Sequence, residues 1–148
     1  MRDRITVQFV RPDRLVYEGD CASVILAAHT GEMGIWPGHA PAVVALGDGV
    51  VRINALLEDG GVTYHVVISG GYAEVDDDTV IILADHARRA DDIEPEVVAE
   101  TLEAARRELE ALDGADPRRA YFENKMAWCN LLLEHASDEP FHPETSQR

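Results

Sequence analysis

The sequence predicts an α+β fold, mostly β, with an N-terminal antiparallel β-sandwich of short strands followed by a C-terminal αα-hairpin. Short apolar runs with a period of two fill the first half, and turn signals break them about every ten residues. The second half changes to the steps of three and four residues that are typical of amphipathic helices. We therefore expect a sandwich domain over residues 1–87, a two-helix hairpin over 88–136 and a disordered tail over 137–148.

The strands of the first half follow one another without a helical segment between them. In the opening strand Ile5, Val7 and Phe9 alternate with polar residues, which is typical of a half-buried strand. The further apolar runs expected to form strands cover residues 15–17, 24–27, 43–46, 50–54, 62–69, 72–75 and 80–84. Residues 70–71, a glycine pair, predict a bulge or tight turn, and the aspartates at 76–78 predict a hairpin turn. The absence of helices between these runs argues against a doubly wound parallel sheet.

The segment from Gly31 to Pro41 differs from the other connections. It holds three glycines and two prolines in eleven residues, which predicts a turn-rich loop of defined shape. Large apolar side chains, Trp36 among them, share this loop with Glu32 and His39. A solvated loop rarely carries such side chains, so we expect this segment to dock against another surface.

The second half reads as two helices. Pro95 suits the first turn of a helix, and an apolar stripe with steps of four and three follows it. This stripe consists of Val98, Leu102, Ala105, Leu109 and Leu112. Asp113-Gly114 closes that helix, and Asp116 is the expected N-cap of the second, with Pro117 at its first helical position. The second stripe consists of Phe122, Met126, Cys129, Leu133 and Ala136. The second helix is too apolar for one partner helix to cover, so it also packs on the β domain or has another partner.

Composition narrows the class of protein. The formal net charge is −15, from 28 acidic and 13 basic residues, which argues against a nucleic-acid surface and against direct adsorption to anionic lipid. No apolar run approaches the length of a transmembrane helix and no apolar signal region opens the chain, which predicts a cytoplasmic location. Cys21 and Cys129 lie in apolar surroundings and are expected to be reduced, buried thiols.

The residues give little support to catalysis. His29, Glu32 and His39 could form a two-histidine, one-carboxylate metal site of a β-barrel enzyme, but the tight His-x-His pair of such sites is absent. The sequence also lacks a Gly-x-Ser-x-Gly elbow and a phosphate-binding loop. Composition therefore favours a binding or structural protein without a cofactor. A metal-dependent enzyme and a free-standing nucleotide sensor stay as alternatives.

Several motifs, in this order, resemble a known family. They are Val16-Tyr17-Glu18-Gly19, the segment from Gly31 to Pro41, Gly49-Val50-Val51-Arg52-Ile53, Gly70-Gly71-Tyr72-Ala73-Glu74-Val75, the run from Val80 to Ala87 and the helical hairpin. This combination resembles the epsilon subunit of the F-type ATP synthase, the counterpart of the mitochondrial delta subunit. The resemblance covers about residues 5–136, nearly the whole chain.

The resemblance implies a rotor subunit of the central stalk without catalytic residues of its own. The sandwich would bind the gamma subunit and the ring of membrane c subunits, and would couple ion flow through that ring to ATP synthesis on the beta subunits. By matching positions, Glu32, Trp36 and His39 would lie at or near the c-ring contact. The subunit would thus sit at the cytoplasmic face of the plasma (inner) membrane, meeting the membrane through the complex alone.

The resemblance also implies a regulatory hairpin. In the family it folds down on the sandwich, or extends along gamma toward the alpha and beta subunits and inhibits ATP hydrolysis. Basic residues of the second helix serve this contact in relatives, and here Arg118, Arg119 and Lys125 remain, while Trp128 indicates a more hydrophobic docking. Some relatives bind ATP through Ile-Asp-x-x-Arg-Ala. Here residues 93–98 place Val97 at the arginine position, so the charge-assisted contact to phosphate is missing and we expect no ATP binding.

Overall fold

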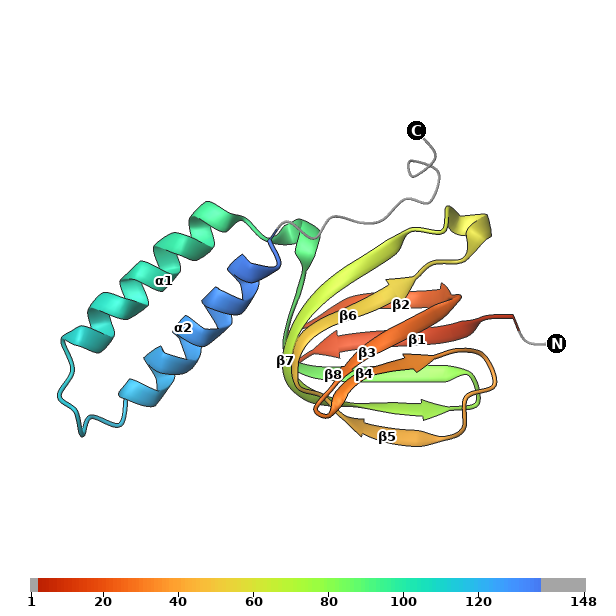
Figure 1. The fold of residues 1–148 in the computed structure, drawn as a ribbon, viewed down its shortest axis with the longest axis horizontal. Coiled ribbons are helices and arrows are strands. Elements are labelled where there is room, and N and C mark those ends of the chain that lie inside the picture. The colour runs from red at the N-terminus through yellow and green to blue at the C-terminus, as the bar shows by residue number, and fades with distance from the viewer. Residues whose placement is uncertain (1–2, 137–148) are drawn as a thin grey trace.

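The computed structural model of the chain describes residues 3–136 as a β-sandwich with a helical hairpin at one end (Figure 1). The tail that the sequence predicts over 137–148 lies outside the described residues. The strands are β1 (Ile5–Arg11), β2 (Arg14–Cys21), β3 (Ser23–Ala28), β4 (Gly31–Ile35), β5 (Ala42–Ala45), β6 (Asp48–Asn54), β7 (Thr63–Asp76) and β8 (Thr79–Arg89). Two short 3-10 turns, η1 (Leu57–Asp59) and η2 (Ala90–Asp92), and the helices α1 (Pro95–Glu110) and α2 (Arg119–Glu134) complete the fold.

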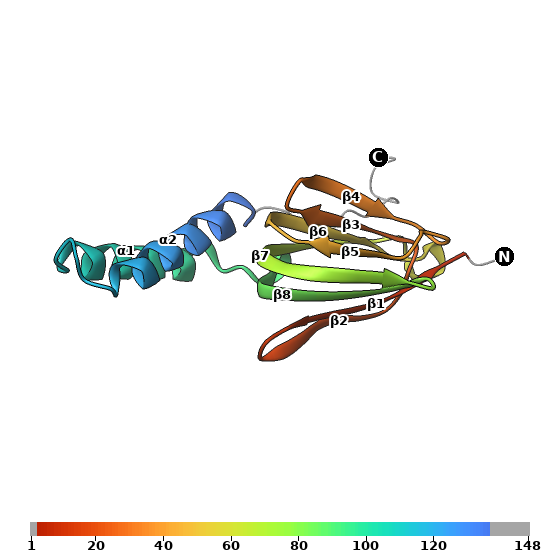
Figure 2. The ribbon, with the colours of Figure 1, turned by 90° about the horizontal axis from the view of Figure 1, so that it is seen from below.

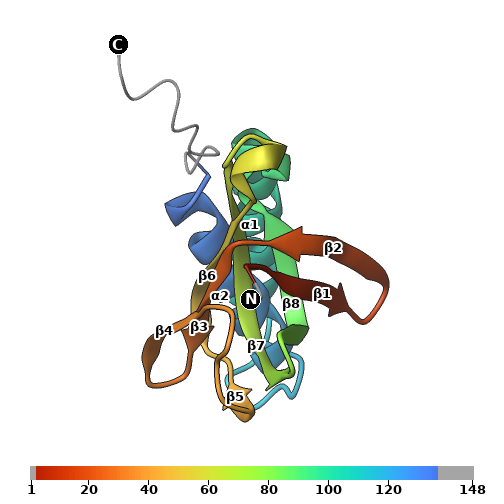
Figure 3. The same ribbon diagram turned by 90° about the vertical axis from the view of Figure 1, so that its right-hand side faces the viewer.

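The strands form two layers that share their longest strands (Figures 2 and 3). Hydrogen bonding follows the order β2-β1-β8-β7-β6-β3-β4, and β5 pairs with the second part of β7. The predicted α+β class with an N-terminal sandwich and a C-terminal hairpin is confirmed. One pair departs from the antiparallel pattern, because β1 runs parallel to β8. These two strands are far apart in the chain, so no tight turn forces them to be antiparallel.

Strand β7 bends so that one strand serves both layers. Its first part pairs with β6 and its second part with β5, while β8 follows it along most of its length. The bend lies at Gly70 and Gly71, where φ is +71° and +120°. The runs predicted over 62–69 and 72–75 are therefore one strand. The glycine pair is a bend inside it and not the predicted bulge or tight turn, because the register with β8 is the same on both sides of the pair.

The main core lies between the two layers. Alternate residues of the strands face inward, as the period of two predicts, and Val7, Phe9, Leu26 and Ile82 have no exposed surface. Cys21 is buried in the same core. Cys129, on α2, is buried where the hairpin meets the sandwich, so both thiols are buried as predicted. Every member of the main core comes from residues before 88, so the sandwich is packed without help from the hairpin.

The helices are shorter than predicted and the turn between them is longer. Helix α1 begins at Pro95 as expected but ends at Glu110, and α2 begins at Arg119. Asp116 was predicted to be the N-cap, with Pro117 the first helical residue, and this was wrong. The Asp116 carboxylate accepts a hydrogen bond from the Arg118 N–H at 2.9 Å, which closes a turn before the helix starts.

A second, smaller apolar cluster joins the hairpin to the sandwich. It buries Val67 of β7 with Ala90, Ile93, Val98 of α1, and Cys129 and Leu132 of α2. Of the two alternatives for the apolar face of the second helix, packing on the β domain is therefore the one found. The division at residues 87 and 88 stays a prediction, although β8 continues to Arg89.

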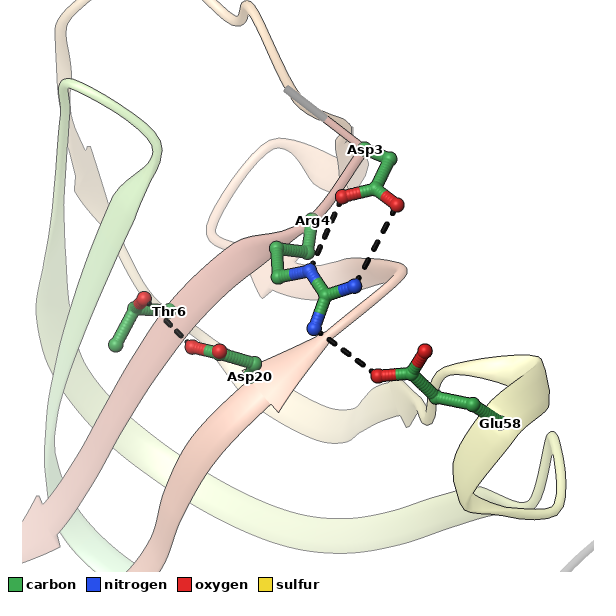
Figure 4. A network of polar contacts seen from close by, with 5 residues as sticks. All are labelled: Asp3, Arg4, Thr6, Asp20 and Glu58. Carbon is green, nitrogen blue, oxygen red and sulfur yellow. Dashed lines mark hydrogen bonds and ion pairs between the residues drawn. The ribbon is translucent and has the colours of Figure 1, made fainter. Parts of the chain in front are cut away.

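A polar network lies at the start of β1, away from the hairpin (Figure 4). The Arg4 guanidinium pairs with Asp3 at 3.0 Å and with Glu58 of η1 at 3.1 Å, while the Thr6 hydroxyl donates to Asp20 at 2.8 Å. The hydrogen bond from Arg4 lowers the pKa of Asp3. All of these groups are exposed, so the network contributes little stability and serves to fix the first strand against η1 and β2.

Candidate functional site

Two of the predicted contact residues, Glu32 and Trp36, lie on the outer face of the sandwich. Residues 31–35 were predicted as part of a loop, but they form β4 because Ile35 is buried in the core and Met33 packs against it. The alternation of the strand then turns Glu32 and Gly34 outward. Glu32 accepts a hydrogen bond from Nη2 of Arg52, on β6, at 3.1 Å. The pair is exposed, so it orients the carboxylate more than it stabilises the fold.

Trp36 lies directly against the backbone of Gly34. A Cβ built at Gly34 would lie 2.1 Å from the indole ring, so any side chain there would displace the ring. The indole nevertheless stays 55% exposed. An exposed aromatic side chain that packs on the backbone of a glycine is the kind of residue that anchors protein interfaces. This position therefore has the character of a docking anchor.

His39 lies in the turn that follows β4 and is fixed by a different set of contacts. The Gly38 N–H donates to the Asp78 carboxylate at 2.6 Å, and the His39 N–H donates to the carbonyl of Trp36 at 3.1 Å. The His39 ring Nδ1 lies 2.7 Å from the carbonyl oxygen of Ala40. Asp78 belongs to the β7–β8 turn, where both central residues have positive φ, which confirms the predicted hairpin turn. The turn thus has the defined shape that its glycines and prolines predict.

The metal hypothesis fails on geometry. His29 lines a groove that faces α2, Glu32 lies beside Arg52, and His39 lies beside the β7–β8 turn. Within residues 3–136, no three His, Cys, Asp or Glu side chains are grouped as ligands of a metal ion. The three residues are close in sequence but serve different surfaces.

The structure shows an apolar surface that the sequence analysis did not identify. It crosses the outer face of the layer formed by β2, β1, β8, β7 and β5, in register from strand to strand. We call it the apolar outer row; it consists of Leu15, Val10, Leu83, Tyr72 and Ala45. Leu15 and Tyr72 are about half exposed, at 51% and 47%. The uninterrupted apolar run at residues 80–84 was a signal, because a strand with one solvated face would alternate.

Arg118 and Arg119, predicted as regulatory contacts, are held within the hairpin turn. Arg118 makes a bidentate pair with Asp116, at 2.8 and 3.2 Å, and this pair raises the pKa of Arg118. Arg119 donates to the carbonyls of Leu109 and Leu112 at 3.3 Å each, at the end of α1. The Leu109 carbonyl also accepts the N–H of Leu112 at 3.2 Å, and Leu112 lies just beyond α1, so Arg119 adds a side-chain donor to the C-terminal end of the helix.

Lys125 and Trp128, the other predicted regulatory residues, lie in different surroundings. The Lys125 ammonium lies 5.7 Å from the centroid of the exposed Tyr121 ring. Trp128 faces the sandwich, and its ring centroid lies 5.5 Å from that of His86 on β8. In this conformation Trp128 is therefore part of the contact between hairpin and sandwich.

Comparison with known proteins identifies the family. The model of the family "ATP synthase, Delta/Epsilon chain, beta-sandwich domain" matches residues 4–90. The chain belongs to this family. The ATP synthase epsilon chain of Anoxybacillus flavithermus is 44% identical over 107 residues, which are 72% of this chain and 77% of that protein. The epsilon chain of a Synechococcus strain is 37% identical over 110 residues, 74% of this chain and 78% of that protein.

Solved structures agree with this assignment. A chain in a mitochondrial ATP synthase assembly of Euglena gracilis that includes the c-ring superposes with a TM-score of 0.67 and 28% identity, covering 94% of this chain and 84% of that one. A chain in the central stalk and c-ring structure of the Tetrahymena thermophila mitochondrial enzyme has a TM-score of 0.53 at 14% identity and supports the fold alone.

Membership in the delta/epsilon family settles the broad role. The chain is a non-catalytic subunit of the central stalk of a rotary, membrane-associated ATP synthase, and the metal-dependent enzyme is set aside. No helix within residues 3–136 has the length and hydropathy to cross a bilayer.

The residues that match the nucleotide motif of some delta/epsilon family members lie where the linker enters α1. Ile93 and Val98 are buried in the small cluster under the hairpin, and Glu94 precedes the first helical residue. Val97 is 52% exposed and carries no charge. The position that holds an arginine in ATP-binding relatives is therefore accessible but offers nothing to a phosphate.

Proposed function

We propose that this delta/epsilon family member couples ion flow through the c ring to ATP synthesis on the beta subunits, by docking on gamma and on the ring as part of the rotor. The single observation that carries the proposal is the apolar outer row, and the exposed Trp36 supports it. Both are exposed, apolar and held by regular structure. The complex would place the subunit at the cytoplasmic face of the plasma membrane.

The apolar outer row supports docking on gamma. Five strands bring Leu15, Leu83 and Tyr72 into one row, and Val43, 76% exposed, lies beside it on β5. Monomers rarely leave such a continuous apolar surface in water, and a surface of this kind marks a protein interface. The strands that carry it are rigid, so little conformational entropy is lost on docking.

Glu32, Trp36 and His39 support the second contact, on the polar loops of the c ring. Their backbone is fixed by β4 and by the hydrogen bond from Gly38 to Asp78. A rotor transmits torque, so a contact that is already ordered before docking is better suited than a mobile one. Glu32 would supply charge, and the exposed Trp36 would supply apolar area.

The side chains of the hairpin support a weak inhibitory effect on ATP hydrolysis. If it extends toward the alpha and beta subunits, Trp128 and Leu132 leave the sandwich and become available for apolar contacts. Arg118 stays paired with Asp116 and Arg119 with the carbonyls at the end of α1, which leaves Lys125 for acidic surfaces. We therefore expect weak inhibition of ATP hydrolysis that depends on Trp128.

Capture by immobilised gamma tests the first contact. Tyr72→Glu and Leu83→Glu place a charge in the apolar outer row and should each weaken capture by about tenfold or more, since a buried unpaired charge is costly. Tyr121→Glu adds the same charge at an exposed position of α2 and serves as the matched control. Equal capture of all three variants would refute docking through the apolar outer row.

Reconstitution of the whole complex tests the second contact and the regulation. Glu32→Ala, Trp36→Ala and His39→Ala should reduce assembly or ATP-driven ion pumping while hydrolysis by the catalytic head continues. Removal of residues 93–148 should raise hydrolysis if the hairpin inhibits. Variants that assemble and pump normally would show that this face does not contact the ring.

A further inference from the structure

The hairpin meets the sandwich through a small contact near its linker. Among residues 3–136, the sandwich contributes Val67 and the partly buried Val50 to the shared apolar cluster, and α2 contributes Cys129 and Leu132 from its last turns. The far end of the hairpin projects away from the sheet (Figures 1 and 2). A long projecting element held at one end is sensitive to any single contact at the edge of that attachment.

Beside this contact, α2 borders an open groove on the sandwich. A groove of about 590 Å³ separates Asn124, Ala127 and Leu131 of the helix from Asp48, Ser69 and Asp85 of the sandwich. Trp128 bridges this groove. Its ring lies 5.5 Å from the His86 ring, centroid to centroid, with the two planes inclined at 35°. The two rings are thus close enough for a stacked aromatic contact.

We propose that the Trp128–His86 pair is a latch that sets how often the hairpin leaves the sandwich. The effect of the latch on ATP hydrolysis rests on the proposed regulatory role. The opening of the hairpin itself can be measured in the isolated chain. His86 belongs to β8, which leads through η2 into α1, so the pair ties α2 back to the strand that carries the linker. Without it, the apolar cluster alone holds the hairpin.

The expected size of the effect follows from the pair. Aromatic contacts shift an equilibrium by about 2- to 10-fold beyond the area they bury. The groove beside the pair is open, so removal of the His86 ring is not compensated by other packing. The hairpin should therefore open about 2- to 10-fold more often without it.

The chain contains its own reporter of opening. Cys129 adjoins Trp128 and is 3% exposed in the docking cluster, while Cys21 is fully buried in the main core. Burial raises the pKa of both thiols, that of Cys21 to about 12. A thiol reagent reacts with an accessible thiolate, so Cys129 is labelled when the hairpin opens and Cys21 when the sandwich unfolds.

The test measures labelling of the full chain by 5,5′-dithiobis(2-nitrobenzoate), with the site of reaction read by peptide mass. His86→Ala should speed the labelling of Cys129 by about 2- to 10-fold and leave Cys21 unchanged. His86→Phe keeps an aromatic ring and should restore slow labelling. His29→Ala removes another histidine that lines the same groove, outside the Trp128–His86 pair, and it should behave like the unmodified chain.

Three outcomes would overturn the latch. Unchanged Cys129 labelling in His86→Ala means that the pair does not hold the hairpin. Equal acceleration of Cys21 means that the substitution loosens the whole fold, and equal effects of His29→Ala mean that the groove, not the pair, is responsible. None of these outcomes bears on capture by gamma, so failure of the latch and failure of the proposed docking are distinguishable.

Discussion

At the scale of single residues, Gly71 and Gly34 are needed for different reasons. Gly71 lies at the bend of β7 with φ at +120°, and a Cβ there would lie 2.1 Å from the carbonyl oxygen of Leu83. Gly34 would place its Cβ equally close to Trp36, but that neighbour is an exposed side chain that can swing away. The first glycine is required by the backbone and the second by the surface it supports.

This contrast gives a stability prediction. Gly71→Ala should lower the free energy of unfolding by about 2 kcal/mol or more, because both the positive φ and a backbone clash oppose it. Gly34→Ala should cost less than about 1 kcal/mol and instead change the fluorescence of Trp36. Urea denaturation measures both, with Gly114→Ala as a control whose Cβ meets nothing within 4 Å. A larger loss in Gly34→Ala than in Gly71→Ala would contradict this account.

Asp116 gives a prediction about pH. Its hydrogen bonds with Arg118, from the side chain first and then from the backbone N–H, lower its pKa to about 2. A carboxyl whose folded pKa is depressed contributes stability above its ordinary pKa of 3.8 and loses it as the pH falls toward 2. Carboxyl resonances followed by NMR should show Asp116 titrating near pH 2, and Arg118→Ala should move the transition up toward 3.8. An unchanged transition in the variant would exclude Arg118 as the cause.

Val97 gives a prediction about ATP. Calorimetry of the purified chain with ATP should show no binding in the sub-millimolar range, because an exposed valine stands where relatives present an arginine to the phosphates. Val97→Arg should bind more tightly than the unmodified chain if the charge is the missing element. Sub-millimolar binding to the unmodified chain would revive the nucleotide sensor.

Residue patterns predicted some surfaces better than others. Glu32 and Trp36 share an outer face because side chains alternate along β4. The glycines of this segment had led us to predict a loop there. The apolar outer row was missed, since its five members come from five strands and are brought into register by tertiary pairing. A one-dimensional pattern shows which side chains share a strand face but not which strands are neighbours.

At the scale of elements, the sequence predicted the positions of the two helices correctly but not the residues at which α1 ends and α2 begins. The apolar stripe locates α1 and α2 because burial of one face determines them. Their ends depend on local hydrogen bonds, such as that from Arg118 to Asp116, which compete with the first helical turn. The parallel pairing of β1 with β8 was likewise beyond reach, because no local signal encodes the neighbour of a distant strand.

The turn of the hairpin gives an element-scale prediction. Arg119→Ala removes a side-chain donor to the carbonyls of Leu109 and Leu112 and should destabilise the end of α1 by about 1 kcal/mol. Amide hydrogen exchange should therefore increase in the last turn of α1 and around the connection. Arg118→Ala, which removes an exposed side chain that pairs with Asp116 and not with α1, should have a smaller effect on α1. Equal exchange in the two variants would remove Arg119 as a cap.

At the scale of the whole molecule, the fold has two apolar cores, and only one of them lies within a single part of the chain. The main core draws all its members from the sandwich, whereas the small cluster needs Val67 and Val50 of the sandwich as well as both helices. Each helix has 16 residues, and isolated helices of that length are marginal in water. We therefore expect the sandwich to fold without the hairpin, and the hairpin to depend on the sandwich or on another surface.

This asymmetry predicts the behaviour of a chain that ends after Asp92. Residues 1–92 should fold cooperatively and keep the capacity for capture by gamma, because the main core and the apolar outer row are both intact. The melting temperature should fall by a few degrees, about what the loss of 1 kcal/mol causes in a domain of this size. Truncation also exposes Val67 and Val50, so some self-association is expected, and Val67→Thr should reduce it. Scanning calorimetry and gel filtration measure these effects. An unfolded truncated chain would show instead that the hairpin is part of one indivisible fold.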